Sequence, residues 1–364
     1  MINIDNVRDA LRHVDDPDLK KDLVSLGMIE EITVEGNTVR FNIVLTTPAC
    51  PLKDMIKNDC IAAIHQYVSP DLEVIPNMTS RVRVAQRNVD MLRNVKNIIA
   101  VSSGKGGVGK STIAANLAVA LAKTGAKTGL LDADIYGPSV PLMFGLSNAH
   151  PQMITREGKN LVVPVEKFDV KILSIGFFVE PEKALVWRGP MASGALTQLF
   201  SETDWGDLDY LVIDMPPGTG DIHLTLVQQL PVTGVVVVTT PQEVALADAR
   251  KALDFYNQEK INVPVLGLVE NMSWFTPAEL PNNKYYIFGK EGGVKFAEST
   301  GVPLLGQIPL VESICESGDQ GNPVANDEKT PTGKAFTSLA AAVAQQVAIR
   351  NAQLPPTEVV KMQE

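Results

Sequence analysis

Two patterns of apolar residues divide the chain. Up to about residue 80, apolar and polar positions alternate at 29–34 and 39–45, and apolar residues recur at helical spacing over 7–14 and about 52–67. The alternating runs predict a hairpin with one buried face, and Val74-Ile75 predicts a further short strand. The order helix, strand, strand, helix, strand indicates a small α+β domain over residues 1–80.

From about residue 96 the apolar residues gather in short continuous runs instead. Such runs, separated by amphipathic helical segments, are typical of a parallel sheet covered on both faces. We predict an α/β domain over 96–350 with a mostly parallel sheet and helices on both faces, a linker at 81–95 and a tail at 351–364. The predicted strands are 98–101, 128–131, 170–175, 210–213, 235–239, 265–269 and 304–308, and the predicted helices are 111–123, 222–229, 244–256 and about 333–350.

Composition and charge narrow the class of protein. The chain has 364 residues, of which 45% are hydrophobic, and a formal net charge of −10. This composition excludes disorder over most of the length, and the negative charge argues against broad binding to nucleic acid or anionic membranes. No apolar run is long enough for a membrane span, the acidic start does not resemble a secretory signal, and three cysteines are too few for a disulfide framework. We expect a cytoplasmic protein with neither nucleic acid nor membrane as a partner.

The strongest motif follows the first strand of the larger domain. The segment 98–112 reads IIAVSSGKGGVGKST and matches G-x-x-x-x-G-K-S/T, with an apolar strand before it and an amphipathic helix after it. Glycines allow successive backbone N–H groups to converge on phosphate oxygens, and the helix N-terminus adds a favourable dipole. Lys110 is expected to neutralise the β- and γ-phosphates, and the Ser111 hydroxyl to ligate Mg²⁺. The predicted nucleotide-binding residues are Gly104, Lys105, Gly106, Gly107, Val108, Gly109, Lys110, Ser111 and Thr112.

Carboxylates end two further predicted strands. Asp132 and Asp134 lie in LLDADIYGPS, and Asp214 ends the apolar run of YLVIDMPPGTG. Ligands of open α/β sheets bind at the carboxyl ends of the strands, so these side chains are expected beside the phosphate loop. We predict that Asp132 and Asp214 hold Mg²⁺ and that Asp134 and Asp214 act in hydrolysis. The alternative is that one of the pair Asp132 and Asp134 caps a turn. The prolines and glycines after Asp214 are typical of a nucleotide-sensing switch.

Lys105 is a second lysine inside the phosphate loop. It is either a solvated side chain on an exposed turn, or the signature lysine of the deviant loop that KGGVGKS resembles in the MinD, ParA and nitrogenase iron-protein class. That resemblance implies a lysine that crosses a dimer interface to the nucleotide of the partner subunit. The two acidic segments favour the second interpretation.

The motifs together resemble those of Mrp/ApbC-type iron–sulfur cluster carrier ATPases. GKGGVGKST, DADIYGPS, WRGPM, DMPPGTGD, TPQE and ENMS occur in that family's order, and the first 80 residues, with TTPACP, are similar to the metal–sulfur cluster assembly domain often fused to it. The resemblance implies a nucleotide-bridged homodimer that hydrolyses ATP and passes clusters to apo-proteins. Since P-loop switches often need a partner to stabilise the transition state, we expect slow hydrolysis by the ATPase core alone. It also implies adenine recognition by Asn271, with residues 307–310 near the base. Asn271 could instead be a turn residue at a strand end.

One departure from that family concerns the cluster ligands. Its members usually carry Cys-x-x-Cys shortly after ENMS, whereas residues 274–289 here contain no cysteine. Cys50 is the remaining candidate for an iron–sulfur ligand, because a helix N-terminus next to it would favour the thiolate. Cys60 lies on an apolar stripe and is expected in the core, and Cys315 has no partner at ligand spacing. The four histidines show no zinc-ligand spacing either.

The sequence therefore leaves two main functions open. The first is an ATP-dependent iron–sulfur carrier whose cluster is held through Cys50 or transiently. The second is a nucleotide-dependent dimeric switch that recruits a protein partner without a cluster, which the missing cysteine pair favours. A nucleotide kinase is a weaker third option, because no lid for an acceptor is recognisable.

Overall fold

The computed structural model describes residues 3–85, 92, 94–156, 158–179, 189–277 and 279–360. It contains two compact units, residues 1–83 with 348–354 and residues 84–347 with 355–364. The smaller unit thus extends three residues into the predicted linker, over 81–83. It also includes residues 348–350 of the predicted α/β domain and residues 351–354 of the predicted tail. Linker residues 86–91 and 93, and Trp187 and Arg188 of the WRGPM segment, lie outside the described residues.

The smaller unit has the predicted α+β order and contains one three-stranded sheet. In this sheet β4 is the central strand, antiparallel to β3 and parallel to β5. The last strand is longer than predicted and runs through Pro76, which an edge strand tolerates because its outer N–H groups need no partner. The elements are α1 (Ile4–Leu11), β1 (Asp15–Asp16), β2 (Lys21–Asp22), β3 (Ile29–Glu35), β4 (Thr38–Leu45), α2 (Lys53–Tyr67) and β5 (Glu73–Ser80).

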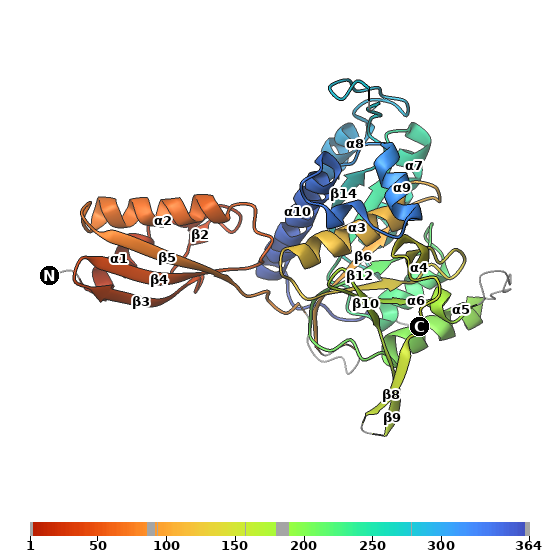
Figure 1. The fold of residues 1–364 in the computed structure, drawn as a ribbon, viewed down its shortest axis with the longest axis horizontal. Helices are drawn as coiled ribbons and strands as arrows, with labels where there is room; N and C mark the ends of the chain where they lie inside the picture. The colour runs from red at the N-terminus through yellow and green to blue at the C-terminus, as the bar shows by residue number, and fades with distance from the viewer. Residues whose placement is uncertain are drawn as a thin grey trace. The chain divides into compact units, whose positions relative to one another are not determined.

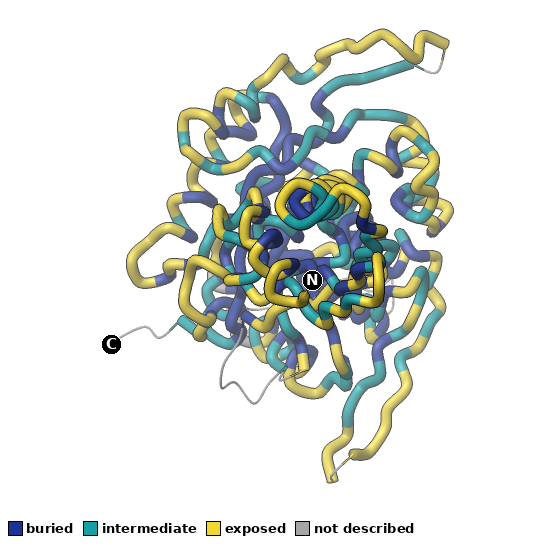
Figure 2. The backbone as a smooth tube through the Cα atoms, turned by 90° about the vertical axis from the view of Figure 1, so that its left-hand side faces the viewer, coloured by how far each residue is buried: buried dark blue, intermediate teal, exposed yellow. Residues whose placement is uncertain are grey.

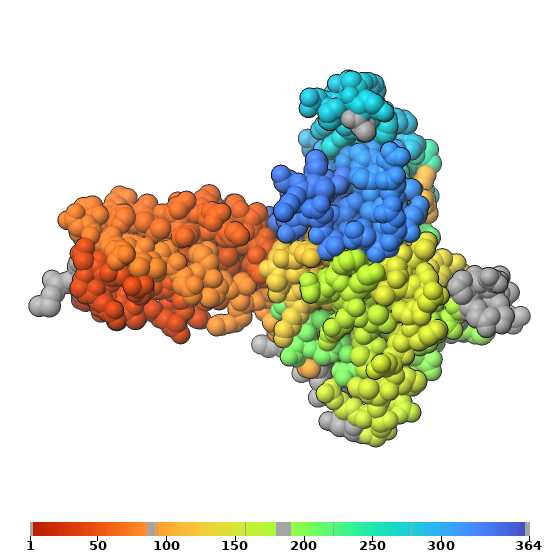
Figure 3. Space-filling view, in the orientation of Figure 1, coloured from red at the N-terminus to blue at the C-terminus, as the bar shows by residue number. Residues whose placement is uncertain are grey.

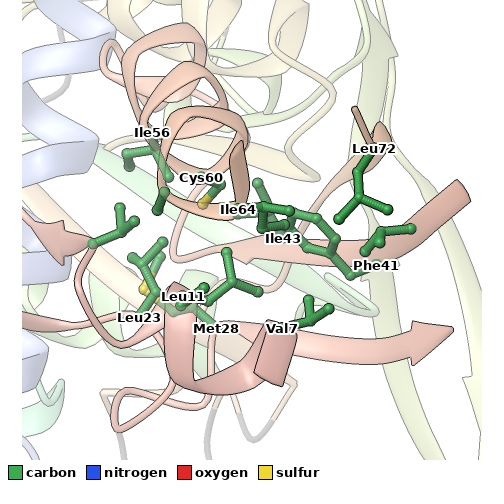
Figure 4. Close-up of a cluster of buried hydrophobic side chains, with 14 of the residues drawn as sticks. Val7, Leu11, Leu23, Met28, Phe41, Ile43, Ile56, Cys60, Ile64 and Leu72 are labelled. Atoms are coloured by element: carbon green, nitrogen blue, oxygen red, sulfur yellow. The ribbon is translucent and has the colours of Figure 1, made fainter. Parts of the chain in front are cut away.

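Apolar side chains from both helices and the sheet form the core of the smaller unit (Figure 4). Leu11 of α1, Ile43 of β4 and Ile64 of α2 are fully buried there. Cys60 lies among them, as predicted, and burial raises the pKa of its thiol to about 12. A thiol with that pKa is a packing residue at neutral pH.

An eight-stranded sheet forms the centre of the larger unit (Figure 1). Its order is β10-β11-β7-β12-β6-β13-β14-β15, and only the edge pair β10–β11 is antiparallel. This confirms the predicted mostly parallel sheet. The strands are β6 (Val95–Ser102), β7 (Thr128–Asp132), β10 (Val165–Lys167), β11 (Val170–Ser174), β12 (Leu208–Asp214), β13 (Gly234–Thr239), β14 (Val265–Glu270) and β15 (Leu304–Gln307).

Helices cover both faces of this sheet. Neighbouring residues of a strand point to opposite faces, and every residue of β7 and β13 is buried, so neither face is open to water there. Helix α3 packs on β6, β7 and β12, while α7 and α8 pack on the other half of the sheet. The helices are α3 (Lys110–Lys123), α4 (Val140–Met143), α5 (Gly189–Ser201), α6 (Asp221–Gln229), α7 (Glu243–Asn257), α8 (Gly292–Thr300), α9 (Glu312–Asp319) and α10 (Pro331–Gln353).

Several elements of the larger unit are absent from the prediction. Helices α4, α5, α8 and α9 are short or lack a clear apolar stripe, and the hairpin of β8 (Gln152–Arg156) and β9 (Lys159–Val163) projects from the unit. Figure 2 shows this hairpin and the segment around 279–285 mainly in the colours of exposed and half-buried residues. A hairpin with little buried surface leaves no strong alternating pattern for sequence analysis to find.

Among the described residues, no helix combines the length and apolar character that a bilayer span requires.

Candidate functional site

The predicted site residues lie at the carboxyl edge of the central sheet. The pairing register places Ser174 beside Asp132, Asp132 beside Asp214, and Asp214 beside Val101, which precedes the phosphate loop. The same edge continues through Thr239, Glu270 and Gln307 on β13, β14 and β15. Parallel pairing thus brings together residues from seven separate strands of the sequence, as expected for an open α/β sheet.

The phosphate loop joins β6 to α3 and has the geometry that its glycines permit. Gly109 adopts φ +82° directly before α3, and a Cβ there would lie 2.2 Å from Nδ2 of Asn271. Only glycine fits, because the position combines left-handed backbone with close approach of a side chain. No side chain caps the first turn of α3, so its N–H groups are available to an anionic ligand.

Lys110 lies between two carboxylates at the base of this loop. Its Nζ is 2.5 Å from Oδ1 of Asp214 and 3.6 Å from Oδ2 of Asp134, and it donates to Oγ of Ser111 at 3.2 Å. The side chain of Lys110 is buried with both of them. Burial raises the pKa of Asp214, an effect that the charge of Lys110 opposes. The loop lysine, Ser111 and both acidic segments therefore meet at one point, as the motifs predict.

Asp132 and Asp134 differ in what their oxygens contact. Oδ2 of Asp132 accepts from Ser174 Oγ at 2.9 Å and from Val140 N at 3.3 Å, and its Oδ1 accepts from the backbone N of Asp134 at 3.2 Å. Burial, together with the charge of Asp214, raises the pKa of Asp132 to about 8. Asp132 thus holds the chain at β11 and α4, which fits the turn-capping alternative better than the predicted role as a metal ligand.

Two buried carboxylate oxygens at this point have no partner among the described residues, Oδ1 of Asp134 and Oδ2 of Asp214. Oxygen atoms left without a donor in a buried site are suited to a hard cation. The structure brings no third His, Cys, Asp or Glu to them within the described part of the chain. This donor set fits Mg²⁺, which commonly binds one or two carboxylates and completes its coordination with phosphate and water.

A cavity of about 350 Å³ opens beside the loop. Its lining includes Thr112 of α3 and Asn271, whose Nδ2 donates to the carbonyl of Val108 in the loop at 2.8 Å. Apolar side chains supply much of the remaining wall, among them Leu142, Met143, Met272, Leu310 and Ile314. A pocket that is largely apolar, with a few placed polar groups and a phosphate-binding loop at its mouth, suits a nucleoside.

Lys105 is half-buried in the loop, and within the described residues its side chain makes no ion pair or hydrogen bond. The loop is fixed locally by Ser103, whose Oγ donates to the carbonyl of Lys105 at 2.9 Å. The ammonium group therefore has no partner among the residues that the structure describes, while its backbone is held.

His223, which sequence reasoning did not single out, is buried in the first turn of α6. It follows the segment Met215–Gly220 and packs edge-on against Phe255, with ring centroids 6.1 Å apart. Burial lowers the pKa of its imidazole to about 4, so the ring is neutral in the folded protein.

Replacing His223 by leucine should reduce the acid sensitivity of the larger unit. The unfolded chain binds a proton on this group below its ordinary pKa of 6.5, whereas the folded protein does not until about pH 4, so the wild type loses stability as the pH falls between these values. From pH 7 to pH 5 the loss from this group is about 2 kcal/mol in the free energy of unfolding. Urea unfolding followed by tryptophan fluorescence measures it, since Trp187, Trp205 and Trp274 all belong to the larger unit. Equal losses in the two proteins over this range would contradict the assignment.

Cys50 does not have the environment that the sequence predicts. Helix α2 begins at Lys53, and Cys50 is half-buried against the apolar core of the smaller unit. Burial raises the pKa of its thiol, where the position near a helix N-terminus had predicted a lowered one. Desolvation outweighs the backbone hydrogen bond from Leu52, at the start of α2, which favours the thiolate. All three cysteines are free thiols, and Cys315 is exposed and lines the cavity.

Comparison with known proteins agrees with this geometry. The family described as NUBPL iron-transfer P-loop NTPase, a ParA group, matches residues 94–344, and a family described as iron-sulfur cluster assembly protein matches residues 4–74. An iron-sulfur cluster carrier protein of Synechocystis sp. is 46% identical over 353 residues, which cover 96% of this chain and 99% of the relative. One from Escherichia coli K12 is 45% identical over 320 residues, covering 87% and 85%.

A solved structure is also similar. A nucleotide-binding protein from Archaeoglobus fulgidus, in complex with ADP, is 36% identical and superposes with a TM-score of 0.57, covering 67% of this chain and 92% of that protein. Together with the sequence relatives, it confirms the resemblance drawn from the motifs and the P-loop fold.

Proposed function

Because the chain belongs to the family of NUBPL iron-transfer P-loop NTPases, we propose that it binds and hydrolyses ATP and delivers assembled iron–sulfur clusters to apo-proteins. The observation that carries the proposal is the meeting of Lys110 with Asp134 and Asp214 beneath a glycine loop, beside a cavity lined by Thr112 and Asn271. This arrangement supplies cations and backbone donors for a triphosphate and a wall for a nucleoside.

Binding divides between two parts of the site. The N–H groups of the loop and of the first turn of α3 receive the phosphates, and Lys110 turns its ammonium from the carboxylates to the β- and γ-phosphate oxygens. Asn271 and the Pro309–Leu310 wall receive the adenosine in the cavity.

Mg²⁺ fits the two buried carboxylate oxygens, Oδ1 of Asp134 and Oδ2 of Asp214, that have no donor among the described residues. Ser111, Asp134 and Asp214 would hold it, and Asp132 would keep Asp134 in place through the backbone hydrogen bond between them. When bound, the ion neutralises charge on the β- and γ-phosphates. We also assign to Asp134 the orientation of the water that attacks the γ-phosphate, and the distance of 3.6 Å between its Oδ2 and Nζ of Lys110 supports this role.

Hydrolysis is completed in a homodimer. Lys105 has no partner of its own among the described residues, and a cation supplied from a second protein copy stabilises charge on the transferred phosphoryl group. A single copy lacks that charge at its own nucleotide and hydrolyses ATP slowly. Dimer formation then links nucleotide state to the delivery of cargo.

The cluster is cargo, and Cys50 is the side chain that we assign to it. Two copies supply two such thiols, and iron binding displaces the proton of a thiol whose pKa burial has raised. Soft thiolate ligands are the usual ligands of iron–sulfur clusters, and a reducing cytoplasm keeps these free cysteines available.

Anaerobic reconstitution with iron and sulfide tests this assignment. The wild type is expected to acquire the visible absorbance of an iron–sulfur cluster, and Cys50→Ser to lose nearly all of it, because serine cannot supply a soft ligand. Cys315→Ser is the matched control and should retain the absorbance, since Cys315 lies in the other unit. Retention by Cys50→Ser and loss by Cys315→Ser would reverse the assignment.

The cluster-free switch remains a distinct second candidate, favoured by the lack of any cysteine in residues 274–289. It predicts nucleotide-dependent dimers in which neither the wild type nor any cysteine variant retains iron. The same reconstitution experiment therefore separates the two functions.

A further inference from the structure

Glu270, the first residue of the ENMS segment, has a buried carboxylate with two specific partners, and the proposed chemistry does not use it. It ends β14, and its side chain is fully buried. Oε2 accepts the backbone N–H of Gly293 at 2.5 Å, and Oε1 accepts from Nε2 of Gln307 at 2.7 Å. A buried carboxylate is retained only where such donors compensate for the loss of water.

The first partner is the N-terminus of α8. This helix begins at Gly292 after Glu291, which adopts φ +60°, and no side chain of the capping residue closes its first turn. The carboxylate of Glu270 takes that place, where the helix dipole favours a negative charge. A Cβ on Gly293 would lie 2.7 Å from Oε2, so the helix can rest on the carboxylate only with glycine at that position.

The second partner joins β14 to β15 at the edge of the nucleoside cavity. The backbone carbonyl of Glu270 accepts from Ile308 N at 2.9 Å and from Ser273 Oγ at 2.8 Å, and Ser273 N donates back to Ile308 at 3.0 Å. Between them Met272 adopts φ +54°, a conformation that a non-glycine residue holds only when its surroundings impose it. The side chain and backbone of Glu270 thus fix this turn against β15.

Residues that line the cavity are close in sequence to Glu270 and Gln307. Asn271 is next to Glu270 in sequence, and Pro309 and Leu310 come two and three residues after Gln307; all three line the cavity. The distance between the two walls is therefore set where Glu270 and Gln307 are joined. The phosphate loop is attached to β6 and α3 instead.

We propose that Glu270 is a positioning residue for nucleoside binding: it clamps β14, β15 and the start of α8 so that Asn271 and the Pro309–Leu310 wall are held at the spacing of a purine nucleoside. The proposal rests on the proposed function, in which this cavity receives the adenosine of ATP. In this proposal Glu270 supports binding of the nucleoside by positioning the cavity walls, whereas the loop binds the phosphates.

Gln307→Glu tests it with two ligands. The new carboxylate has no N–H to donate and faces the carboxylate of Glu270, so the clamp on β15 opens; Glu270→Gln alone would be compensated by rotation of the Gln307 amide. In isothermal titration with Mg²⁺, the dissociation constant of a non-hydrolysable ATP analogue should rise about tenfold, the effect of losing one charge-assisted hydrogen bond, while that of inorganic tripolyphosphate should change less than about twofold. Gln258→Glu, the same change at an exposed residue after α7, is the matched control and should leave both unchanged.

A swapped pair separates positioning from a general loss of structure. In the double variant Glu270→Gln, Gln307→Glu, the amide at position 270 accepts from Gly293 and donates to the carboxylate at position 307, which restores both hydrogen bonds. Its affinity for the ATP analogue should return to within about twofold of the wild type. Circular dichroism melts establish that each variant is folded at the titration temperature.

Three results would overturn the inference: unchanged affinity of Gln307→Glu for the analogue, a parallel fall in its affinity for tripolyphosphate, or no recovery in the double variant. If the wild type binds neither ligand, the proposed function itself is wrong. If the wild type binds both and Gln307→Glu matches it, ATP binding stands and only the positioning role of Glu270 is excluded.

Discussion

Lys110→Ala is expected to raise the dissociation constant for ATP by at least about a hundredfold and to abolish measurable hydrolysis. The substitution removes the cation that lies between Asp134 and Asp214 and leaves their carboxylates facing incoming phosphates, and loss of one partner from a buried ion pair costs about 3–5 kcal/mol. Isothermal titration with ATP and Mg²⁺, and a phosphate-release assay, measure the two effects.

Lys123→Ala is the matched control for that experiment. It removes the same charge from the other end of the same helix, where Lys123 forms the last turn of α3, and should leave both quantities within about twofold of the wild type. Near-normal binding by Lys110→Ala would mean that the loop does not hold the phosphates.

Lys105→Ala is expected to separate binding from catalysis. Hydrolysis should fall by about a thousandfold, the effect of removing a cation supplied in trans to a phosphoryl group, while the dissociation constant for ATP stays within about twofold of the wild type. The physical reason is that Lys105 has no partner within the described part of its own chain, and that in the proposed dimer its charge would act on the nucleotide of the other copy.

Mixing the two lysine variants gives a sharper form of this test. In a mixed dimer, the copy that lacks Lys105 still binds ATP through Lys110, and the copy that lacks Lys110 still offers Lys105 to it. Partial recovery of hydrolysis from two nearly inactive proteins is therefore expected. If Lys105 acts on the nucleotide of its own chain, the mixture should show only the sum of the separate activities.

The phosphate loop and the acidic strand ends could be predicted from the sequence because short motifs and the geometry of parallel strands determine them. The glycines of 104–109 permit one kind of loop, and parallel strands end at one edge, so Lys110 and Asp214 had to meet. The core position of Cys60 followed in the same way from helical spacing.

Sequence analysis could not predict the features that depend on long-range packing. Glu270 meets Gly293 and Gln307, 23 and 37 residues further on, and no local pattern announces either contact. Asp132 and Asp134 look equivalent in sequence, and only the approach of Ser174 distinguishes them. The raised pKa of Cys50 arises from burial against the core, which the loop sequence does not reveal.

The proposed function requires ATP to hold two copies of the chain together through the phosphate loop. Light scattering after size-exclusion chromatography, with Mg²⁺ and a non-hydrolysable ATP analogue, tests it most directly. The predicted result is a particle of twice the 39.3 kDa chain mass that carries bound analogue and reverts to one chain in Lys110→Ala. A particle of single-chain mass without bound analogue would contradict the claim.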